Sequence, residues 1–390
     1  MKISKKTALL IMSCFLFTTC ENTNMPVQEN TAPFRLVVYI ETGEWGWRRD
    51  QNNEPKELYA LDKIDAAKIT HVNYGFAVLG GQDFTEIIMP KRNWPVVQDT
   101  MILEKVMSWK RQNPGLKVLL SIGGWKVDGF SQMASSHATR TAFAENCLSV
   151  INTYGFDGID LDWEYPGFYG SSNDSERIAY TNSDVDNYLL LLREIRNKIG
   201  TNKLLSICLD GGGMDQNRRV NSVEYFTSIR GKAFHEVLDY VNIMAYDNGN
   251  ENAAYNWAIN LLNIYSNNAN HGFTRKQLNL GLPFFSRSAT PTLDYKSYEE
   301  MINELIGTQG GVFNNANTNA HRIIMPDNTW CSIESPEMIR RKMQFVRDNG
   351  FGGAMVYELS QDKNNDLLNT IYSNLNGDGM YQSPYLPVTY

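Results

Sequence analysis

Short apolar runs alternate along the chain with segments in which apolar residues recur every three or four positions. A short run with little polar interruption is typical of a strand that is buried on both faces. Such runs lie at 34–40, 70–77, 116–122, 156–162, 203–209, 240–246, 277–282 and 352–357. The alternation predicts consecutive β–α units and an α/β fold.

The clearest helical pattern covers residues 183–199. Its apolar side chains share one face of a helix: Val185, Tyr188, Leu189, Leu192, Ile195 and Ile199. Ser183 is the predicted N-cap, and Gly200 follows the last periodic residue.

Eight strands separated by helices predict a (β/α)8 TIM barrel over residues 34–375. Such a barrel takes about 250 residues or more, so the chain of 390 residues is long enough for it. An open doubly wound sheet is the alternative, but the glycine pattern that binds dinucleotides is absent from the first strand–helix turn. The long stretch between the seventh and eighth strands, about 283–335, predicts a small insertion. Residues 376–390 are interpreted as a tail.

Charge and composition indicate which classes of molecule the protein binds. The formal net charge is −7, and the sequence contains no block of Lys and Arg. An acidic surface repels phosphate, so we expect no nucleic-acid partner, and nothing indicates a partner protein. The 8 Trp and 20 Tyr residues fit sugar binding, in which flat rings pack on pyranose faces.

The N-terminus has a basic start, a short apolar stretch at 7–19 and then Cys20. The apolar stretch is too short to span a bilayer. The pattern resembles a bacterial lipoprotein signal, in which the cysteine becomes the lipidated first residue. We therefore predict a signal peptide at 1–20, lipid attachment at Cys20, a tether at 21–33 and secretion to a membrane surface of the cell envelope. The alternatives are Cys14 and secretion without a lipid.

The remaining cysteines are Cys147, Cys208 and Cys331. Their odd number and wide spacing argue against a disulfide framework, and no Cys/His ligand pattern is present. We predict neither a metal nor a cofactor, and we interpret Cys208 as a small buried residue.

Three acidic residues alternate at the end of the fourth apolar run. Because successive side chains of a strand point to opposite faces, Asp160, Asp162 and Glu164 share one face. In a barrel they would point into the lumen at the end where active sites lie. Like charges this close raise at least one pKa and so supply a proton donor, as glycoside hydrolysis requires. Binding of Mg²⁺ or Ca²⁺ and a solvated loop stay open as alternatives.

The pattern Asp157-x-x-Asp160-x-Asp162-x-Glu164 resembles the signature of family 18 glycoside hydrolases, which include chitinases and endo-β-N-acetylglucosaminidases. Four further motifs are similar to the family's third, sixth, seventh and eighth strand motifs and follow in its order. They read SIGGW at 121–125, NIMAYD at 242–247, GLPFFSR at 281–287 and GGAMVYE at 352–358. The resemblance covers roughly residues 34–372.

The resemblance implies a role for each of four residues. Glu164 would protonate the glycosidic oxygen, and the substrate's own 2-acetamido carbonyl would attack the anomeric carbon. Asp162 would orient the acetamido N–H and stabilise the oxazolinium, with Asp160 behind it. Tyr246 would donate a hydrogen bond to the acetamido oxygen. Asp157 is interpreted as a structural brace.

The resemblance also implies residues that line the substrate: Trp125, Met244, Asp247, Arg287 and Tyr357. Met244 is equally well interpreted as a core residue. The family usually has Trp where this chain has Tyr357, so the floor under the sugar is smaller here. Trp257 or Trp330 is a candidate to compensate.

The predicted function is that of a retaining, chitinase-type hydrolase of β-1,4-linked N-acetylglucosamine in chitin or chito-oligosaccharides. Trp163 and the sequence Tyr165-Pro166-Gly167 favour chitinases. An endo-β-N-acetylglucosaminidase that acts on N-glycans is the alternative with the same chemistry. A non-hydrolytic glycan-binding lipoprotein is the alternative from another class, although such relatives usually lack the acid that Glu164 supplies.

Overall fold

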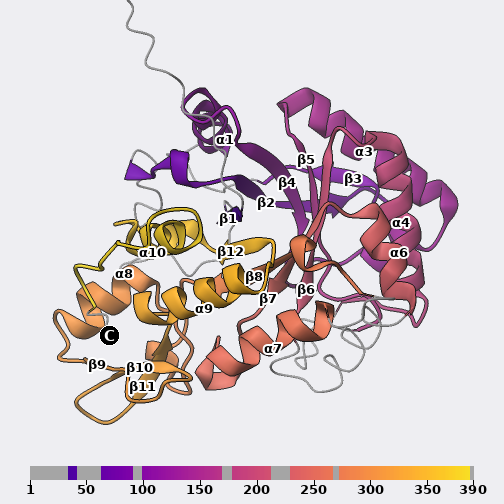
Figure 1. Cartoon of the computed structure of the whole chain (residues 1–390). Coiled ribbons are helices and arrows are strands. Elements are labelled where there is room, and N and C mark those ends of the chain that lie inside the picture. The colour runs from indigo at the N-terminus through magenta and orange to yellow at the C-terminus, as the bar shows by residue number, and fades with distance from the viewer. Residues whose placement is uncertain are drawn as a thin grey trace, which may run out of the picture.

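The computed structural model describes residues 34–41, 63–90, 99–168, 178–211, 229–266 and 272–386 (Figure 1). The predicted signal peptide, its Cys20 and the tether lie outside these ranges. In the part of the chain that is described, no helix is both long and apolar enough to cross a bilayer.

Eight parallel strands close into a barrel. In chain order they are β1 (Arg35–Glu41), β2 (His71–Gly80), β4 (Lys117–Gly123), β5 (Gly158–Asp162), β6 (Leu204–Asp210), β7 (Tyr240–Met244), β8 (Leu278–Pro283) and β12 (Gly353–Tyr357). Each pairs with its neighbours, and β1 pairs with both β2 and β12. This closure confirms the predicted (β/α)8 barrel and excludes the open sheet. Every predicted run overlaps one of these strands.

Helices surround the strands (Figure 1). They are α1 (Asp99–Ser108), α2 (Phe130–Ala134), α3 (His137–Tyr154), α4 (Asp184–Ile199), α6 (Ile229–Val237), α7 (Tyr255–Ser266), α9 (Pro336–Asp348) and α10 (Asp366–Leu375). Short helical turns lie at Ala66–Lys68, Trp109–Arg111, Gly249–Glu251, Arg275–Gln277, Pro291–Leu293 and Leu359–Gln361.

Helix α4 matches the predicted helix, but its start differs in detail. The Ser183 side chain makes no capping hydrogen bond. Asp184 instead accepts from the backbone N–H of Thr181 at 2.8 Å and from its hydroxyl at 2.6 Å. The residue that stabilises this turn is therefore the neighbour of the predicted cap. Gly200 ends the helix, as predicted, with its N–H bonded to the carbonyl of Arg196.

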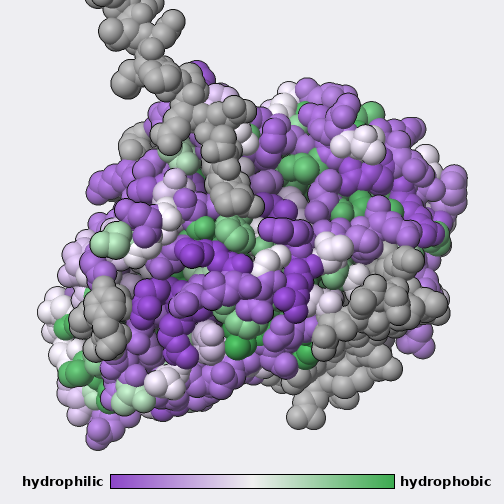
Figure 2. Space-filling model, in the orientation of Figure 1, coloured by the Kyte–Doolittle hydropathy of each residue, from purple (hydrophilic) through white to green (hydrophobic). Residues whose placement is uncertain are grey.

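The strand alternation separates two buried regions. Ile159 and Leu161 of β5 point outward and pack in a large apolar core between strands and helices. Trp163 belongs to the same outer core, where its ring stacks on that of Phe130 with centroids 5.3 Å apart. Asp160 and Asp162 point inward to the lumen, where a smaller cluster of aromatic and aliphatic side chains lies. On the face that Figure 2 shows, the described surface is mainly hydrophilic and its hydrophobic residues are scattered.

An insertion separates β8 from β12, as predicted. It contains α8 (Tyr298–Glu300), a π-helical turn at Met301–Ile306 and an antiparallel sheet of β9 (Val312–Asn314), β10 (His321–Ile324) and β11 (Trp330–Ile333). A fully buried ion pair follows the sheet: Lys342 of α9 lies 2.5 Å from Glu334 and donates to the carbonyl of Ala253 at 2.6 Å. This pair joins the insertion to α9 and to the segment before α7.

Two smaller segments complete the fold. Strand β3 (Glu86–Ile88) runs antiparallel to the end of β2. The described part of the predicted tail, up to residue 386, packs against α10. There the hydroxyls of Tyr381 and Ser383 donate to Asp366 at 3.0 and 2.7 Å. This part of the tail is therefore held on the domain.

Candidate active site

Asp160 is fully buried in the barrel lumen and accepts three hydroxyl hydrogen bonds. Tyr39 and Ser121 donate to its Oδ2 at 2.7 and 2.8 Å, and Ser206 donates to its Oδ1 at 2.5 Å. Burial raises the pKa of Asp160, while these donors act in the opposite direction. Because three hydroxyls from β1, β4 and β6 turn toward this one carboxyl, the site is built to hold a negative charge there.

Asp162, two residues further along β5, is 4% exposed. Its pKa is well above the ordinary value because of burial, then the charges of Glu164 and Asp160, and then a hydrogen bond with Glu164. Its Oδ1 atom is buried without a hydrogen-bond partner among the described residues. Asp162 therefore interacts directly with Glu164 and keeps one buried acceptor atom without a partner among the described residues.

Gly123 makes room for this arrangement at the end of β4. Its φ is +119°, and a Cβ there would lie 2.1 Å from the carbonyl oxygen of Asp162. The N–H of Gly124 donates to that same carbonyl at 2.8 Å. A side chain at position 123 would push the end of β5 away, so the glycine is required.

Glu164 lies just beyond β5 and, unlike Asp160 and Asp162, is only partly buried. The three carboxyls thus run from the closed lumen toward its mouth. A carboxyl that is partly accessible and lies next to a buried carboxyl is suited to donate a proton to a bound ligand.

Tyr246 follows β7 and is 8% exposed. Its ring stacks on Tyr357 with centroids 6.2 Å apart and meets Phe285 edge-on at 5.8 Å. Burial first, and then the nearby Cys208 and Asp162, raise the pKa of Tyr246 well above its usual value. Its hydroxyl is therefore neutral and available as a donor.

Tyr357 lies in an aromatic group at the C-terminal end of the barrel. Its ring centroid lies 5.9 Å from that of Tyr39 and 6.4 Å from those of Phe76 and Phe285. Trp257 packs against the outer core, and the guanidinium of Arg322 lies 3.8 Å over the Trp330 ring. Compensation by either tryptophan for the smaller ring of Tyr357 stays a prediction.

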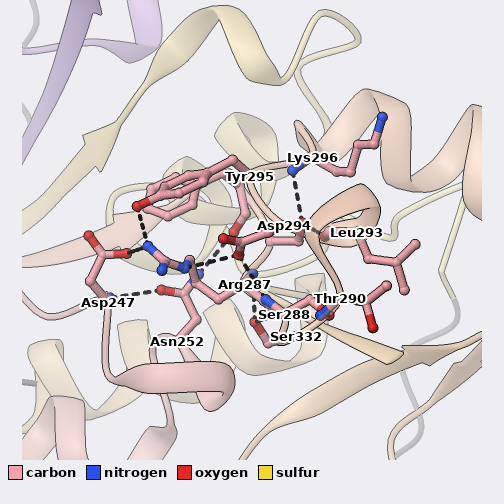
Figure 3. A network of polar contacts seen from close by, with 12 residues as sticks. Asp247, Asn252, Arg287, Ser288, Thr290, Leu293, Asp294, Tyr295, Lys296 and Ser332 are labelled. Carbon is pink, nitrogen blue, oxygen red and sulfur yellow. Dashed lines mark hydrogen bonds and ion pairs between the residues drawn. The ribbon is translucent and has the colours of Figure 1, made fainter. Parts of the chain in front are cut away.

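Asp247 and Arg287, which are 40 positions apart in the sequence, form an ion pair (Figure 3). Nη1 of Arg287 donates to Asp247 at 2.8 Å, and Nε lies 3.1 Å from Asp294. The guanidinium lies 4.2 Å over the ring of Tyr295 and also donates to its hydroxyl. Since Asp247 directly follows Tyr246, this network fixes the loop after β7 against the insertion.

Met244 and Trp125 complete the predicted set. Met244 is 8% exposed and belongs to the inner cluster. Trp125 is partly exposed, and its ring meets Tyr165 at 6.4 Å. Both therefore lie beside the acidic residues. Asp157 lies at the opposite end of β5, where it accepts from Lys110 at 2.6 Å and from the N–H of Val118 at 2.7 Å, as expected of a brace.

Sequence reasoning missed several residues of the site. Tyr39 and Glu41 lie at the end of the first apolar run, two positions apart, so they share one face of the strand. This spacing could have identified them as residues that point into the barrel. Asp294 and Tyr295 belong to the insertion, where no motif marks them. In the described ranges, no group of three or more His, Cys, Asp or Glu residues could hold a metal ion, and the Asp160 oxygens already accept from hydroxyls.

Comparison with known proteins adds a family match. The model of "Glycosyl hydrolases family 18" matches residues 35–362. Chitinase A1 of Niallia circulans is 26% identical over 464 aligned positions, which cover 95% of this chain and 63% of that protein. Chitinase 1 of Aphanocladium album is 26% identical, over 92% of this chain and 89% of that protein. Among solved structures, chitinase ChiW of a Paenibacillus species superposes with a TM-score of 0.67 at 25% identity. The superposition covers 89% of this chain and 33% of that one.

Proposed function

We propose that this chain, which belongs to glycosyl hydrolases family 18, cleaves β-1,4-linked N-acetylglucosamine in chitin or chito-oligosaccharides with retention of configuration. The observation that carries the proposal is the row of Asp160, Asp162 and Glu164 along and just beyond β5, with Asp160 held in the lumen by three hydroxyl donors. The relatives named as chitinases support the same substrate class.

Glu164 is the proton donor in this proposal. It transfers its proton to the glycosidic oxygen as the bond from that oxygen to the anomeric carbon breaks. The carbonyl oxygen of the substrate's 2-acetamido group then bonds to the anomeric carbon, which gives an oxazolinium. Water next attacks this carbon as its bond to the acetamido oxygen breaks, the ionised Glu164 takes the water's proton, and the product keeps its configuration.

Asp162 and Tyr246 act on the acetamido group. The free Oδ1 of Asp162 is a buried acceptor for the acetamido N–H, and its charge balances the oxazolinium. The neutral Tyr246 hydroxyl donates to the acetamido oxygen and so holds it in place for attack on the anomeric carbon. Asp160 holds a compensating charge behind Asp162.

The substrate-binding roles of Trp125, Met244, Asp247, Arg287 and Tyr357 are part of the same proposal. Their support is their position at or just after the C-terminal ends of β4, β7, β8 and β12, the same end of the barrel at which Asp162 and Glu164 lie on and after β5. Trp125 would stack on a sugar face, and the Asp247–Arg287 pair would offer polar groups to sugar hydroxyls.

For the whole chain we propose export and a lipid anchor at Cys20, so that hydrolysis takes place at a membrane surface of the cell envelope. The support is the basic, apolar and cysteine pattern of residues 1–20. The lipid adds no group to the active site.

Two substrates offered in parallel test the proposed function. Wild-type protein is incubated with chitohexaose and, separately, with a high-mannose glycopeptide, and the products are identified by mass spectrometry. We expect shortened chito-oligosaccharides and an intact glycopeptide. Cleavage of the glycopeptide alone would assign the N-glycan activity instead. Binding of chitohexaose without cleavage would indicate a lectin.

A further inference from the structure

A row of hydrogen bonds crosses the barrel lumen and ends at Asp160. Nε of Arg35 donates to Asn279 at 3.0 Å, Asn279 donates to Asn242 at 2.9 Å, and Asn242 donates to the hydroxyl oxygen of Tyr39 at 3.5 Å. Tyr39 donates in turn to Asp160 at 2.7 Å. Tyr39, Asn242, Asn279 and Asp160 are at most 1% exposed. The row therefore links the N-terminal end of β1 to the active site through the interior.

Arg35 fixes the direction of this row. A guanidinium has donors and no acceptor, so Asn279 must turn its carbonyl oxygen to Arg35 and its amide N–H group to Asn242. Asn242 must then accept with its oxygen and donate toward Tyr39. Tyr39 has one proton to donate, and with its oxygen already accepting from Asn242 it directs this proton to Asp160. Sγ of Cys208 lies 2.8 Å from the same hydroxyl oxygen and in this arrangement is a second donor to it. Without the cation, both amides could reverse, and the proton of Tyr39 could go to Asn242.

We propose that Arg35 is a positioning residue for the glycosidic reaction, because it forces the Tyr39 proton onto Asp160 and so sets the charge balance of the catalytic carboxyls. Only the expected effect of Arg35 on turnover depends on the proposed function. Its effect on Asp160 is a property of the protein alone.

The positive charge of Arg35 is not neutralised by an ion pair within the described residues. The nearby carboxylate, Asp239, pairs with Arg196 at 2.5 Å, and in the described ranges no carboxylate forms an ion pair with Arg35. Arg35 also donates to the carbonyl of Lys276 and lies 5.1 Å over the Tyr240 ring. These two contacts alone would give Arg35 a purely structural role. The hydrogen bond to Asn279 is the contact that connects Arg35 to the active site.

Other titratable groups face the two ends of the row and enter any pH profile. Around Arg35 they are His71, Lys117, Asp239 and Tyr240. Around Asp160 they are Tyr39, Asp162, Glu164, Tyr188, Cys208 and Tyr240. These groups interact, so a profile reports pKa values of the whole cluster.

Arg275, in the helical turn just before β8, provides a matched control. Like Arg35, it donates to a backbone carbonyl, that of Asn349, and lies over an aromatic ring, that of Phe351 at 5.2 Å. It has no bond to the asparagine row. Arg35→Met and Arg275→Met therefore remove the same kind of side chain and the same local contacts, and only Arg35→Met releases the row.

The first test compares the pH dependence of kcat/KM for chitohexaose in the two variants. For Arg35→Met we expect both limbs to move to higher pH by about half a unit or more, because loss of a cation from a poorly screened interior raises the pKa of every nearby acid. We also expect kcat to fall and KM to stay near its wild-type value, since Arg35 is far from the substrate end. Arg275→Met should keep the wild-type profile. Superimposable profiles for all three proteins would overturn the proposal.

A second variant, Asn279→Asp, reverses the row without removing Arg35. The new carboxylate still accepts from Arg35 but cannot donate to Asn242, so the Asn242 amide must turn over. Its oxygen then faces Tyr39 and competes with Asp160 for the Tyr39 proton. The ion pair with Arg35 preserves the local structure, so this variant answers the question if Arg35→Met fails to fold.

The readout for both variants is the titration of Asp160 itself, followed by carboxyl ¹³C NMR with the resonance assigned from Asp160→Asn. We expect its pKa to rise in Arg35→Met and in Asn279→Asp but not in Arg275→Met. The measurement needs no substrate, so it stands even if wild-type protein cleaves neither chitohexaose nor the glycopeptide. An unchanged Asp160 titration in both row variants would refute the role of Arg35.

Discussion

The hydroxyl of Tyr357 donates a hydrogen bond at 3.0 Å to Oε2 of Glu41, a residue 316 positions earlier in the chain. Glu41 ends β1 and is 7% exposed. The contact joins the neighbouring strands β1 and β12 where they reach the active site. It fixes the plane of the Tyr357 ring, and through that ring it positions the ring of Tyr246.

Enlarging this ring tests how tightly the floor is packed. Tyr357→Trp must fit a larger side chain among Tyr39, Phe76 and Phe285 and loses the bond to Glu41. We expect the free energy of unfolding to fall by about 1–3 kcal/mol and chitohexaose to bind more weakly. Urea denaturation and calorimetric titration measure the two effects. Tighter binding at unchanged stability would show that the floor has spare room.

The fold and the acidic triad were predictable from the sequence because both depend on local periodicity. The period of two placed Asp160, Asp162 and Glu164 on one face without any knowledge of their neighbours. Contacts such as Tyr357 with Glu41 were not predictable, because periodicity assigns a face to a residue but no partner on another strand. The same limit explains why the row from Arg35 to Asp160 and the Asp294–Arg287 pair were missed.

The charge of Asp162 sets the pH range over which Glu164 can donate a proton. Asp162→Asn removes a neighbouring negative charge and a shared hydrogen bond, so the pKa of Glu164 falls. Because the donor must be protonated, activity is lost as pH rises through this pKa. We therefore expect the alkaline limb of kcat against pH to move to lower pH and kcat to drop about 10²–10³-fold. An alkaline limb that stays in place would contradict the coupling.

The buried pair of Lys342 and Glu334 should be important for stability. Lys342→Met leaves Glu334 buried without its cation, which costs about 3–5 kcal/mol. The matched control is Lys198→Met, because Lys198 pairs with Glu145 at 2.9 Å on the exposed surface and such pairs contribute about 1 kcal/mol or less. Denaturant unfolding distinguishes the two. Equal losses would mean that the buried pair contributes no more than an exposed one.

Lipid attachment is testable in cells with a fatty-acid probe. Wild-type protein and Cys14→Ala should incorporate the label, and Cys20→Ala should not, since only the predicted first residue of the mature chain carries the lipid. Fractionation should find the labelled protein with membranes. Labelling that survives Cys20→Ala but is lost in Cys14→Ala would move the attachment site to Cys14.

The most direct test of the account is the turnover of chitohexaose by Glu164→Gln. The substitution keeps the size of the side chain and removes the proton that the leaving oxygen needs. We predict a loss in kcat of about 10³-fold or more, with calorimetric affinity for chitohexaose close to that of wild type. A variant that binds chitohexaose and still turns it over at more than a few per cent of the wild-type rate would contradict the assignment of Glu164 as the acid.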